Sequence, residues 1–354
     1  MSIVISFLDP FEALQVEGVE KFLQEMVRRG WKEKKTYKSI KHLTTVHRYD
    51  LSDKEYSVTA WKTVHGGPSC SGYLFCLGGE RDTPSNQNAT YSFLDNPSAQ
   101  LIDNDDILGN DGFPRDWSAV AATIDAHGRI RTFGGFNGRN SVAQCLVYPS
   151  ESERRRDTQQ KNQWKPSGQL PSPCCFASAC TTSDGHVVVT GGGSSLFQGA
   201  AVSGHTFLQQ NTGAESTRAL TWQKVASMQH LRCGHSSAVL PSGKVVVTGG
   251  YAGGMDYLTS TEMYDSALDR WMVQPRASMH CARSGFGFGL SSNGAVYAFG
   301  GSSNGSDGHD SVEMYDERVG RWELLPQKMR SGRGYLGGCV GGSSGCLYAA
   351  GGVR

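Results

Sequence analysis

A short apolar run that ends in a glycine pair recurs six times along this chain of 354 residues. One copy is KVVVTGG at residues 244–250, and the first glycines of the six pairs stand at positions 78, 134, 191, 249, 300 and 351. The steps between them are 56, 57, 58, 51 and 51 residues. Helical solenoids repeat every 33 to 47 residues or so, and this longer period favours a ring of strand units.

Each repeat predicts more than one strand. Upstream of the glycine pair, a second apolar run is joined to it by a two-residue turn signal such as Ser242-Gly243 or Asn293-Gly294. Glycine adopts positive φ without steric cost, so these pairs predict tight hairpins. Downstream, the sequence Glu-Met-Tyr-Asp leads to Trp271 in one copy and to Trp322 in the next. Each repeat therefore predicts four antiparallel strands.

The glycine pairs favour a packing role over phosphate binding. No helical pattern follows them, and no lysine stands at the spacing that a phosphate-binding loop needs. Glycine inside a strand is expected where backbone must approach another segment closely, as around the axis of a ring of sheets. Tyrosine and tryptophan in the outer strands would then fill the wedge between neighbouring sheets.

Together, the apolar run, the glycine pair, Tyr-Asp and Trp resemble the kelch repeat. The resemblance extends from residue 43 to the end of the chain, and the last two copies match the pattern almost position for position. Earlier copies match less closely, and the third has Phe207 and Trp222 where a closer copy has Tyr and Trp. The resemblance implies an all-β fold, a six-bladed kelch β-propeller formed as one domain by residues 43–354.

The two ends of the chain supply complementary halves of one blade. Residues 46–50 (VHRYD) with Trp61 have the pattern of third and fourth strands, whereas residues 334–352 have that of a first and a second strand. We therefore predict that residues 43–64 and 334–354 form blade six together. Such closure by both termini leaves no open sheet edge.

Residues 1–42 precede the propeller as a predicted helical extension and a basic linker. Asp9 is a capping residue, Pro10 suits the first helical position, and Glu12 stands three residues after the cap. The apolar face of this helix would pack on the propeller itself or dock a partner. The linker that follows is rich in Arg and Lys, and we interpret it as solvated rather than as a nucleic-acid site.

Neither the charge nor the cysteine content indicates a cofactor, and the cysteines indicate a reducing compartment. The net charge is +1, so no global field favours nucleic acid or membrane. None of the ten cysteines forms a CxxC motif, and the neighbours Cys174 and Cys175 are interpreted as two reduced thiols, with an oxidation sensor as the alternative. We expect a cytoplasmic, monomeric protein without metal or other cofactor.

The candidate site lies on the loops that follow the glycine pairs and on those that lead into the first strands. Arginines before the first strands resemble those that ring the channel mouth of kelch adaptors, where they would bind an acidic peptide segment through paired hydrogen bonds to carboxylates. The alternative is that they pin the backbone. The predicted partner-binding residues are Arg115, Arg232, Arg283, Arg333, Arg139, Tyr251, Tyr257 and His309.

The function expected from these residues is that of a protein-interaction scaffold or adaptor, and not of an enzyme. A copper radical oxidase would need paired histidines and tyrosines with a cysteine, but His205 and His235 have positions typical of strand packing. An iron site with Glu, Asp and His at steps of four is missing from the sequence. A sugar-acting propeller of the mutarotase or isomerase type, which needs little more than charged residues in the channel mouth, stays open as the alternative.

Overall fold

The computed structural model describes residues 60–65, 71–77, 89–94, 114, 117–150, 153, 163–195, 200–210, 221–291, 293–329, 331–341 and 346–350. The predicted helical extension and basic linker over residues 1–42 lie outside these ranges, as does Arg115. The elements within the ranges are β-strands, numbered β1 to β23.

These strands form antiparallel sheets, each built from strands close together in sequence. The first sheet has β1 (Ala60–His65), β2 (Ser71–Leu77) and β3 (Ala89–Leu94). The second has β4 (Ala121–Ile124), β5 (Ile130–Phe133), β6 (Gln144–Tyr148) and β7 (Lys165–Gln169). The third has β8 (Ser178–Thr181), β9 (Val187–Thr190), β10 (Thr206–Gln209) and β11 (Trp222–Val225).

The remaining sheets follow the same plan. The fourth has β12 (Ser236–Val239), β13 (Val245–Thr248), β16 (Thr261–Asp265) and β17 (Arg270–Val273), and a ribbon of β14 (Tyr251–Gly253) and β15 (Asp256–Tyr257) lies between β13 and β16 in sequence. The fifth has β18 (Gly287–Leu290), β19 (Val296–Phe299), β20 (Ser311–Asp316) and β21 (Arg321–Lys328). The sixth has β22 (Gly337–Gly341) and β23 (Cys346–Ala350). The predicted four-stranded unit is thus confirmed in the second to fifth sheets.

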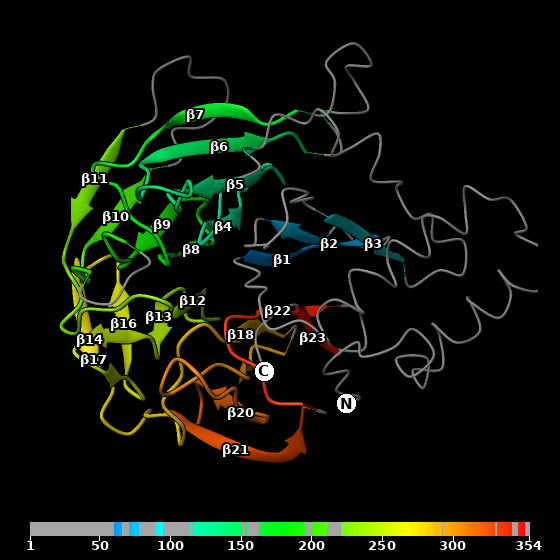
Figure 1. Ribbon diagram of the computed structural model, residues 1–354, viewed down its shortest axis with the longest axis vertical. Helices are drawn as coiled ribbons and strands as arrows, with labels where there is room; N and C mark the ends of the chain where they lie inside the picture. Colours follow the sequence, from blue (N-terminus) through cyan, green and yellow to red (C-terminus); the bar gives the residue numbers. More distant parts are fainter. Residues whose placement is uncertain are drawn as a thin grey trace, which may run out of the picture.

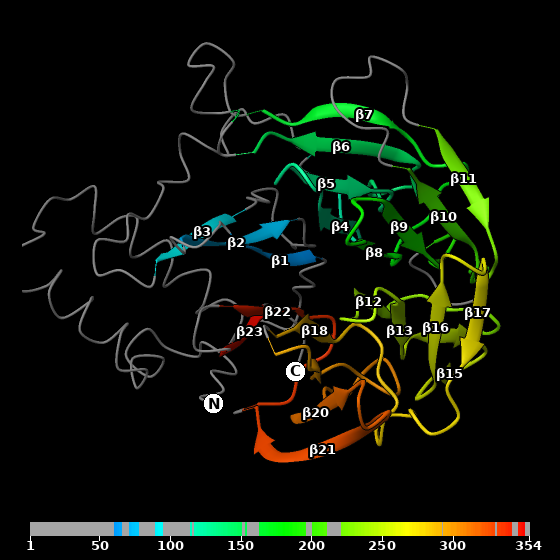
Figure 2. The same cartoon turned by 180° about the vertical axis from the view of Figure 1, so that it is seen from behind.

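The sheets are arranged around a common centre, with the first strand of each sheet innermost (Figures 1 and 2). These first strands contact one another in the order β1, β4, β8, β12, β18 and β22, and β22 also contacts β1. The all-β architecture is consistent with a kelch β-propeller, as the sequence predicts. The six-blade count and the closure by both termini stay predictions, because residues 43–59 and 351–354 lie outside the described ranges.

One predicted boundary needs correction. The sequence pattern predicts that residues 60–64 belong to blade six, with Trp61 in its fourth strand. In the structure they belong to β1, which pairs with β2 in register Trp61 with Cys76. The reason is the short connection between β1 and β2, which favours a hairpin within one sheet over pairing with a strand from the other end of the chain.

Apolar side chains pack between neighbouring sheets rather than in one central core. The second strands β5, β9, β13 and β19 are buried along their whole length, since a sheet covers each of their faces. This double burial explains why β9, β13 and β19 are nearly continuous apolar runs instead of alternating ones, whereas β5 also buries Arg131 and Thr132. One cluster, for example, joins Cys180 and Val188 of the third sheet to Val245, Tyr264 and Trp271 of the fourth.

Tryptophans in the fourth strands donate hydrogen bonds to the sheet that precedes theirs in sequence. Trp271 donates its indole N–H to Thr206 Oγ1 at 3.0 Å, and Trp322 donates to Thr261 Oγ1 at 3.0 Å. Each of these tryptophans also packs against a tyrosine of its own sheet, with the ring centroids of Tyr264 and Trp271 5.2 Å apart. The prediction that Tyr and Trp fill the wedge between sheets is therefore confirmed for these blades.

The glycine pairs have the packing role that the sequence predicts. In the pair Gly249-Gly250, both residues have positive φ, 65° and 99°. A Cβ on Gly249 would lie 2.7 Å from the carbonyl oxygen of Arg283, and Gly250 donates its N–H to that same oxygen at 2.7 Å. The pair thus joins one sheet to the segment that leads into the next, at a distance that no side chain permits.

Candidate functional site

The predicted binding loops share one face of the molecule. Residues that follow the glycine pairs form isolated antiparallel bridges with residues that lead into the first strand of the same sheet, and the bridged pairs are Ser118 with Phe136, Cys175 with Gly193, Cys233 with Tyr251 and Ser284 with Ser302. We call this side the loop face. The tight turns that join first to second strands and third to fourth strands lie at the other ends of the strands, on what we call the turn face.

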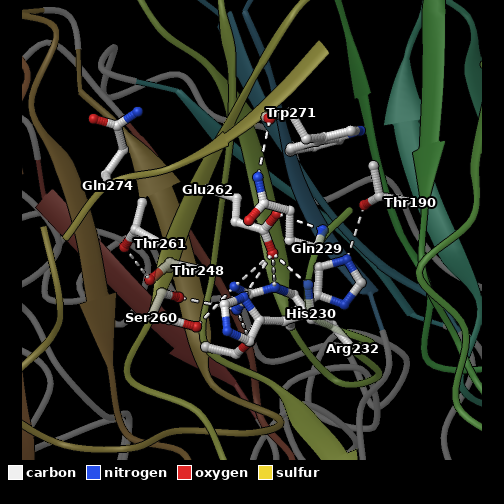
Figure 3. A network of polar contacts seen from close by, with 12 residues as sticks. Thr190, Gln229, His230, Arg232, Thr248, Ser260, Thr261, Glu262, Trp271 and Gln274 are labelled. Atoms are coloured by element: carbon white, nitrogen blue, oxygen red, sulfur yellow. Dashed lines mark hydrogen bonds and ion pairs between the residues drawn. The ribbon is translucent and has the colours of Figure 1, made fainter. Parts of the chain in front are cut away.

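Arg232 leads into β12 and is fully buried. Its guanidinium donates to the carbonyl oxygens of Gly249 at 2.7 Å and Ser260 at 2.9 Å, and to Glu262 Oε1 at 3.0 Å (Figure 3). Glu262 is buried as well, and its carboxylate also accepts the backbone N–H groups of Gln229 at 2.7 Å and His230 at 3.0 Å. Burial lowers the pKa of Arg232, and the Glu262 carboxylate opposes that shift.

The same network recurs 51 residues later. Arg283 donates to the carbonyl oxygen of Gly300 at 2.6 Å and to Glu313 Oε1 at 2.9 Å, and both charged side chains are buried. Burial opposes ionisation of Glu313, but hydrogen bonds from the His280 N–H and the charge of Arg283 outweigh it, so the pKa of Glu313 is lowered. In each copy, the arginine connects the glycine pair, the third strand and the segment before the first strand.

These contacts correct the interpretation of Arg232 and Arg283 as partner-binding residues. Their guanidinium groups have no exposed surface and are bound to groups within their own sheets. The alternative given with that interpretation, a backbone-pinning role, is the one that fits the hydrogen bonds. Arg333 is also buried, with 2% of its surface exposed, and its carbonyl oxygen accepts the N–H of Gly301 at 2.8 Å.

The third sheet has apolar residues in place of the buried pair. The carbonyl that accepts from the second glycine of the second sheet belongs to Cys174, which therefore occupies the position of Arg232. Strand register puts Phe207 at the position of Glu262, since Val189 pairs with Phe207 as Val247 pairs with Glu262. Cys174 and Phe207 lie in one apolar cluster. Both charges are lost together, as expected for groups that are costly to bury alone.

The other predicted partner-binding residues do lie on the loop face, with their side chains at least partly accessible. Arg139 is exposed after the glycine pair of the second sheet. Tyr251 and Tyr257 come from the two strands of the β14–β15 ribbon, with ring centroids 5.1 Å apart. His309 is half-buried in the fifth sheet, and its Nε2 lies 3.1 Å from the carbonyl oxygen of Ala282. Burial lowers the pKa of His309, and nearby Arg283 adds to this.

Sequence reasoning missed a ring of residues in the left-handed conformation, which we call the belt. Its members stand two residues before the first strands and have φ between 52° and 62°: Ala119, Phe176, Gly234, Gly285 and Tyr335. Backbone hydrogen bonds join consecutive members. Phe176 N–H donates to the Ala119 oxygen at 2.9 Å, Gly234 N–H to the Phe176 oxygen at 2.8 Å, and Gly285 N–H to the Gly234 oxygen at 2.9 Å.

The belt encircles a pocket where the first strands begin. The belt members line it together with the residues that follow them, namely Val120, Ala177, His235, Ser236, Phe286 and Leu336. Burial, reinforced by the charge of Arg232, lowers the pKa of His235 to about 3, so this histidine is neutral. Its Nε2 lies 2.8 Å from Thr190 Oγ1. The described residues that line the pocket are therefore uncharged.

A signal for the belt was present in the sequence. Belt members stand two residues after the arginines, as in Arg283-Ser-Gly285 and Arg333-Gly-Tyr335. Glycine at this offset in two copies indicates positive φ. Tyr335 could have been found by that spacing, but Phe176 could not, because Cys174 replaces its arginine.

The buried cysteines are poor nucleophiles. Burial raises the pKa of Cys174 to about 12, with added repulsion from Cys175 and Cys145. Burial likewise raises the pKa of Cys145 to about 11 and of Cys233 to about 12. A thiol must lose its proton to react, so these values favour the interpretation of Cys174 as a structural thiol over that of a sensor.

Metal-dependent catalysis has no support in the part of the chain that the structure describes. No group of three or more His, Cys, Asp or Glu side chains there could hold a metal ion. His205 packs beside Phe207, with ring centroids 6.0 Å apart, and His235 is buried against Thr190. Both histidines thus have the strand-packing positions that the sequence indicates.

Comparison with known proteins agrees with the repeat pattern. A family profile described as the Kelch motif matches residues 232–277 and 288–329, which cover the fourth and fifth sheets. The chain therefore contains kelch motifs in these two sheets. The first match begins at Arg232 and contains its buried ion pair with Glu262, whereas the second match contains Glu313 but begins five residues after Arg283.

A curated relative extends this finding. The chain is 30% identical over 127 residues to Kelch-like protein 26 of Danio rerio. The match covers 34% of this chain and 19% of that protein, so the two share less than a fifth of the relative's length. Separately, the described residues contain no helix of the length and apolarity needed to cross a lipid bilayer.

Proposed function

We infer that this chain forms a six-bladed kelch propeller, closed by strands from both ends, and works as a protein-interaction scaffold that binds a partner on its loop face. The observation that carries this proposal is the composition of that face. Strands and belt hold side chains from several sheets rigidly at one mouth, where exposed Met255 lies beside Tyr251 and donates its backbone N–H to the tyrosine hydroxyl at 3.4 Å. Arg139 is exposed on the same face. Rigid strands with variable loops are the usual basis for recognition surfaces.

Acidic peptide recognition is not part of this proposal. It depended on a cluster of guanidinium groups, but Arg232, Arg283 and Arg333 are buried. Sugar chemistry of the mutarotase type is not favoured either, because the described residues that line the pocket inside the belt are uncharged. We therefore propose binding without catalysis. A cytoplasmic location, a monomeric state and the lack of nucleic-acid or membrane binding stay predictions.

Affinity purification with variants of the two faces tests the proposal. Arg139→Ala combined with Met255→Ser alters the loop face, whereas Leu268→Ser combined with Val319→Ser alters the turn face at two exposed apolar residues, 68% and 58% accessible. We expect a defined set of proteins to be recovered with wild type and with the turn-face variant, and to be lost with the loop-face variant. Loss with the turn-face variant alone would contradict the proposed site.

A further inference from the structure

Large apolar side chains on the loop face adopt a backbone conformation that only glycine adopts freely. Phe176 has φ 53°, Tyr335 has φ 54°, and Met255 at the tip of the β14–β15 ribbon has φ 72°. The belt positions equivalent to Phe176 and Tyr335 in the fourth and fifth sheets are Gly234 and Gly285, so the belt itself needs no side chain there. Strain of this kind concentrates where side chains have a function.

These strained residues form an aromatic patch with the tyrosines of the ribbon. The rings of Phe176 and Tyr335 have centroids 6.4 Å apart, and those of Tyr251 and Tyr257 are 5.1 Å apart. Tyr257 Oη and Tyr335 Oη lie 2.8 Å and 3.5 Å from the point that a Cβ on Gly305 would occupy. The two pairs of rings therefore meet beside this glycine, and Met255, 77% exposed, extends the patch outward.

The charges around the patch disfavour carboxylates. The described residues that line the pocket inside the belt are uncharged, and the loop-face residues Asp256 and Asp307 are exposed. Burial raises the pKa of Tyr257 and of Tyr335, and their neighbours add to this, so both hydroxyls stay neutral. Neutral hydroxyls donate hydrogen bonds to carbonyl groups. An acidic residue would instead face Asp256 and Asp307, and none of the described residues that line the pocket supplies a counter-charge.

We propose that the mouth of the belt binds a partner protein segment through an apolar side chain, aromatic or long and aliphatic, and not through an acidic one. This inference rests on the proposed function and specifies the chemistry of the partner. The anchor side chain packs against Phe176 and Tyr335, with Met255 covering its outer side. The hydroxyls of Tyr257 and Tyr335 donate to carbonyl groups of the partner backbone. Aromatic anchors buried near the centre of an interface commonly supply most of its binding energy.

Selection of random peptides on the full chain tests this proposal. We expect enrichment of peptides with Phe, Trp, Leu or Met at a fixed position, and depletion of Asp and Glu around it. The best peptide is then measured by fluorescence anisotropy on Phe176→Gly, Tyr335→Gly and Met255→Gly. Each change removes an apolar side chain and relieves backbone strain, and we expect affinity to fall about tenfold or more at the two belt positions.

Leu268→Gly is the matched control, because it removes an apolar side chain that is 68% exposed on the turn face, outside the belt and its pocket. It should leave the affinity unchanged. Met255→Gly keeps the test decisive if a belt variant melts early, since this exposed side chain makes little contribution to folding.

Other outcomes separate this inference from the proposed function. Enrichment of acidic peptides, or binding that all three glycine variants retain, overturns the apolar anchor and leaves loop-face binding intact. Absence of any enriched peptide, when affinity purification still recovers partners that the loop-face variant loses, overturns recognition of a linear segment. Failure of both experiments contradicts the proposed function itself.

Discussion

Replacing Glu262 with glutamine tests how strongly the buried arginine network stabilises the fold. The carboxylate of Glu262 accepts hydrogen bonds from Arg232 and from the backbone N–H groups of Gln229 and His230. A glutamine side chain keeps one acceptor oxygen, but its amide group must point toward at least one of these donors. The variant therefore leaves a donor without an acceptor and the Arg232 charge buried without a counter-charge.

The expected cost follows from this geometry. Both side chains have 0% exposed surface, so solvent cannot replace the lost contacts. Removing one partner of a buried ion pair typically costs about 3 to 5 kcal/mol. Native domains are stable by only about 5 to 15 kcal/mol, so the variant should lose a large part of its stability. Urea unfolding, followed by tryptophan fluorescence, measures this as a lower midpoint.

Two further variants make the measurement decisive. Glu313→Gln removes the same group from the repeated network of the fifth sheet and should cost a similar amount. Asp316→Asn removes the partner of the exposed Arg318 and should leave the midpoint unchanged. A change below about 1 kcal/mol for Glu262→Gln would refute the reasoning, because it would mean that the bonds of Arg232 to the Gly249 and Ser260 carbonyls suffice.

The third sheet suggests how the network could be replaced. Cys174 and Phe207 stand at the positions of Arg232 and Glu262, and Pro171, which has no N–H, stands three residues before Cys174 as Gln229 stands before Arg232. The combined variant Gln229→Pro, Arg232→Cys and Glu262→Phe removes both charges and one donor together. We expect it to cost less than Glu262→Gln alone, since paired removal leaves no uncompensated charge.

Three other predictions concern the same framework. Gly249→Ala should destabilise the chain by about 2 to 4 kcal/mol in urea unfolding, because its Cβ would lie 2.7 Å from the Arg283 oxygen. Gly243 has φ 83°, and a Cβ there would have no neighbouring atom within 4 Å, so Gly243→Ala should cost only about 1 kcal/mol. If both alanine variants lost the same stability, the close approach at Gly249 would not be the cause. His235 has a folded-state pKa of about 3, below its ordinary value of 6.5, so the unfolded chain binds the extra proton and stability falls as pH drops below 6.5. His235→Phe, which copies Phe286, should remove up to about 1.4 kcal/mol of this loss per pH unit between pH 6.5 and 4.5, and an unchanged slope in urea titrations would exclude His235 as its source. Cys145 and Cys174, with raised pKa values, should react with a thiol reagent at pH 8 only after unfolding, and rapid labelling of the folded chain would contradict their burial.

Local chemistry explains why much of the fold could be predicted. Val245–Thr248 forms a strand because a continuous apolar run suits burial on both faces, and Ser242-Gly243 forms the turn before it because glycine accepts φ 83°. Trp271 and Trp322 pack where the repeat pattern put them. The exception was residues 60–64, whose sequence fits an outer strand as well as a first one.

The site was harder to predict, because exposure depends on what surrounds a side chain. Arg232 and Arg283 had the type and spacing of ligand-binding arginines, and only the buried carboxylates of Glu262 and Glu313 decided otherwise. Tyr251 and Tyr257 lie on the loop face, as their place after a glycine pair indicates. Tyr335 stands at the same offset from its arginine as Gly234 and Gly285, but Phe176 has no such signal because Cys174 replaces the arginine.

The sequence by itself determined the repeat, the strands and their tight turns, because these follow from side-chain periodicity and from the conformational freedom of glycine over a few residues. Tertiary structure alone decided which charges are buried in pairs and which rings meet at the mouth of the belt. Such contacts join residues about 30 to 160 positions apart, as in Arg232 with Glu262 and Phe176 with Tyr335. Their energy depends on the exclusion of water, which no local pattern of residues specifies.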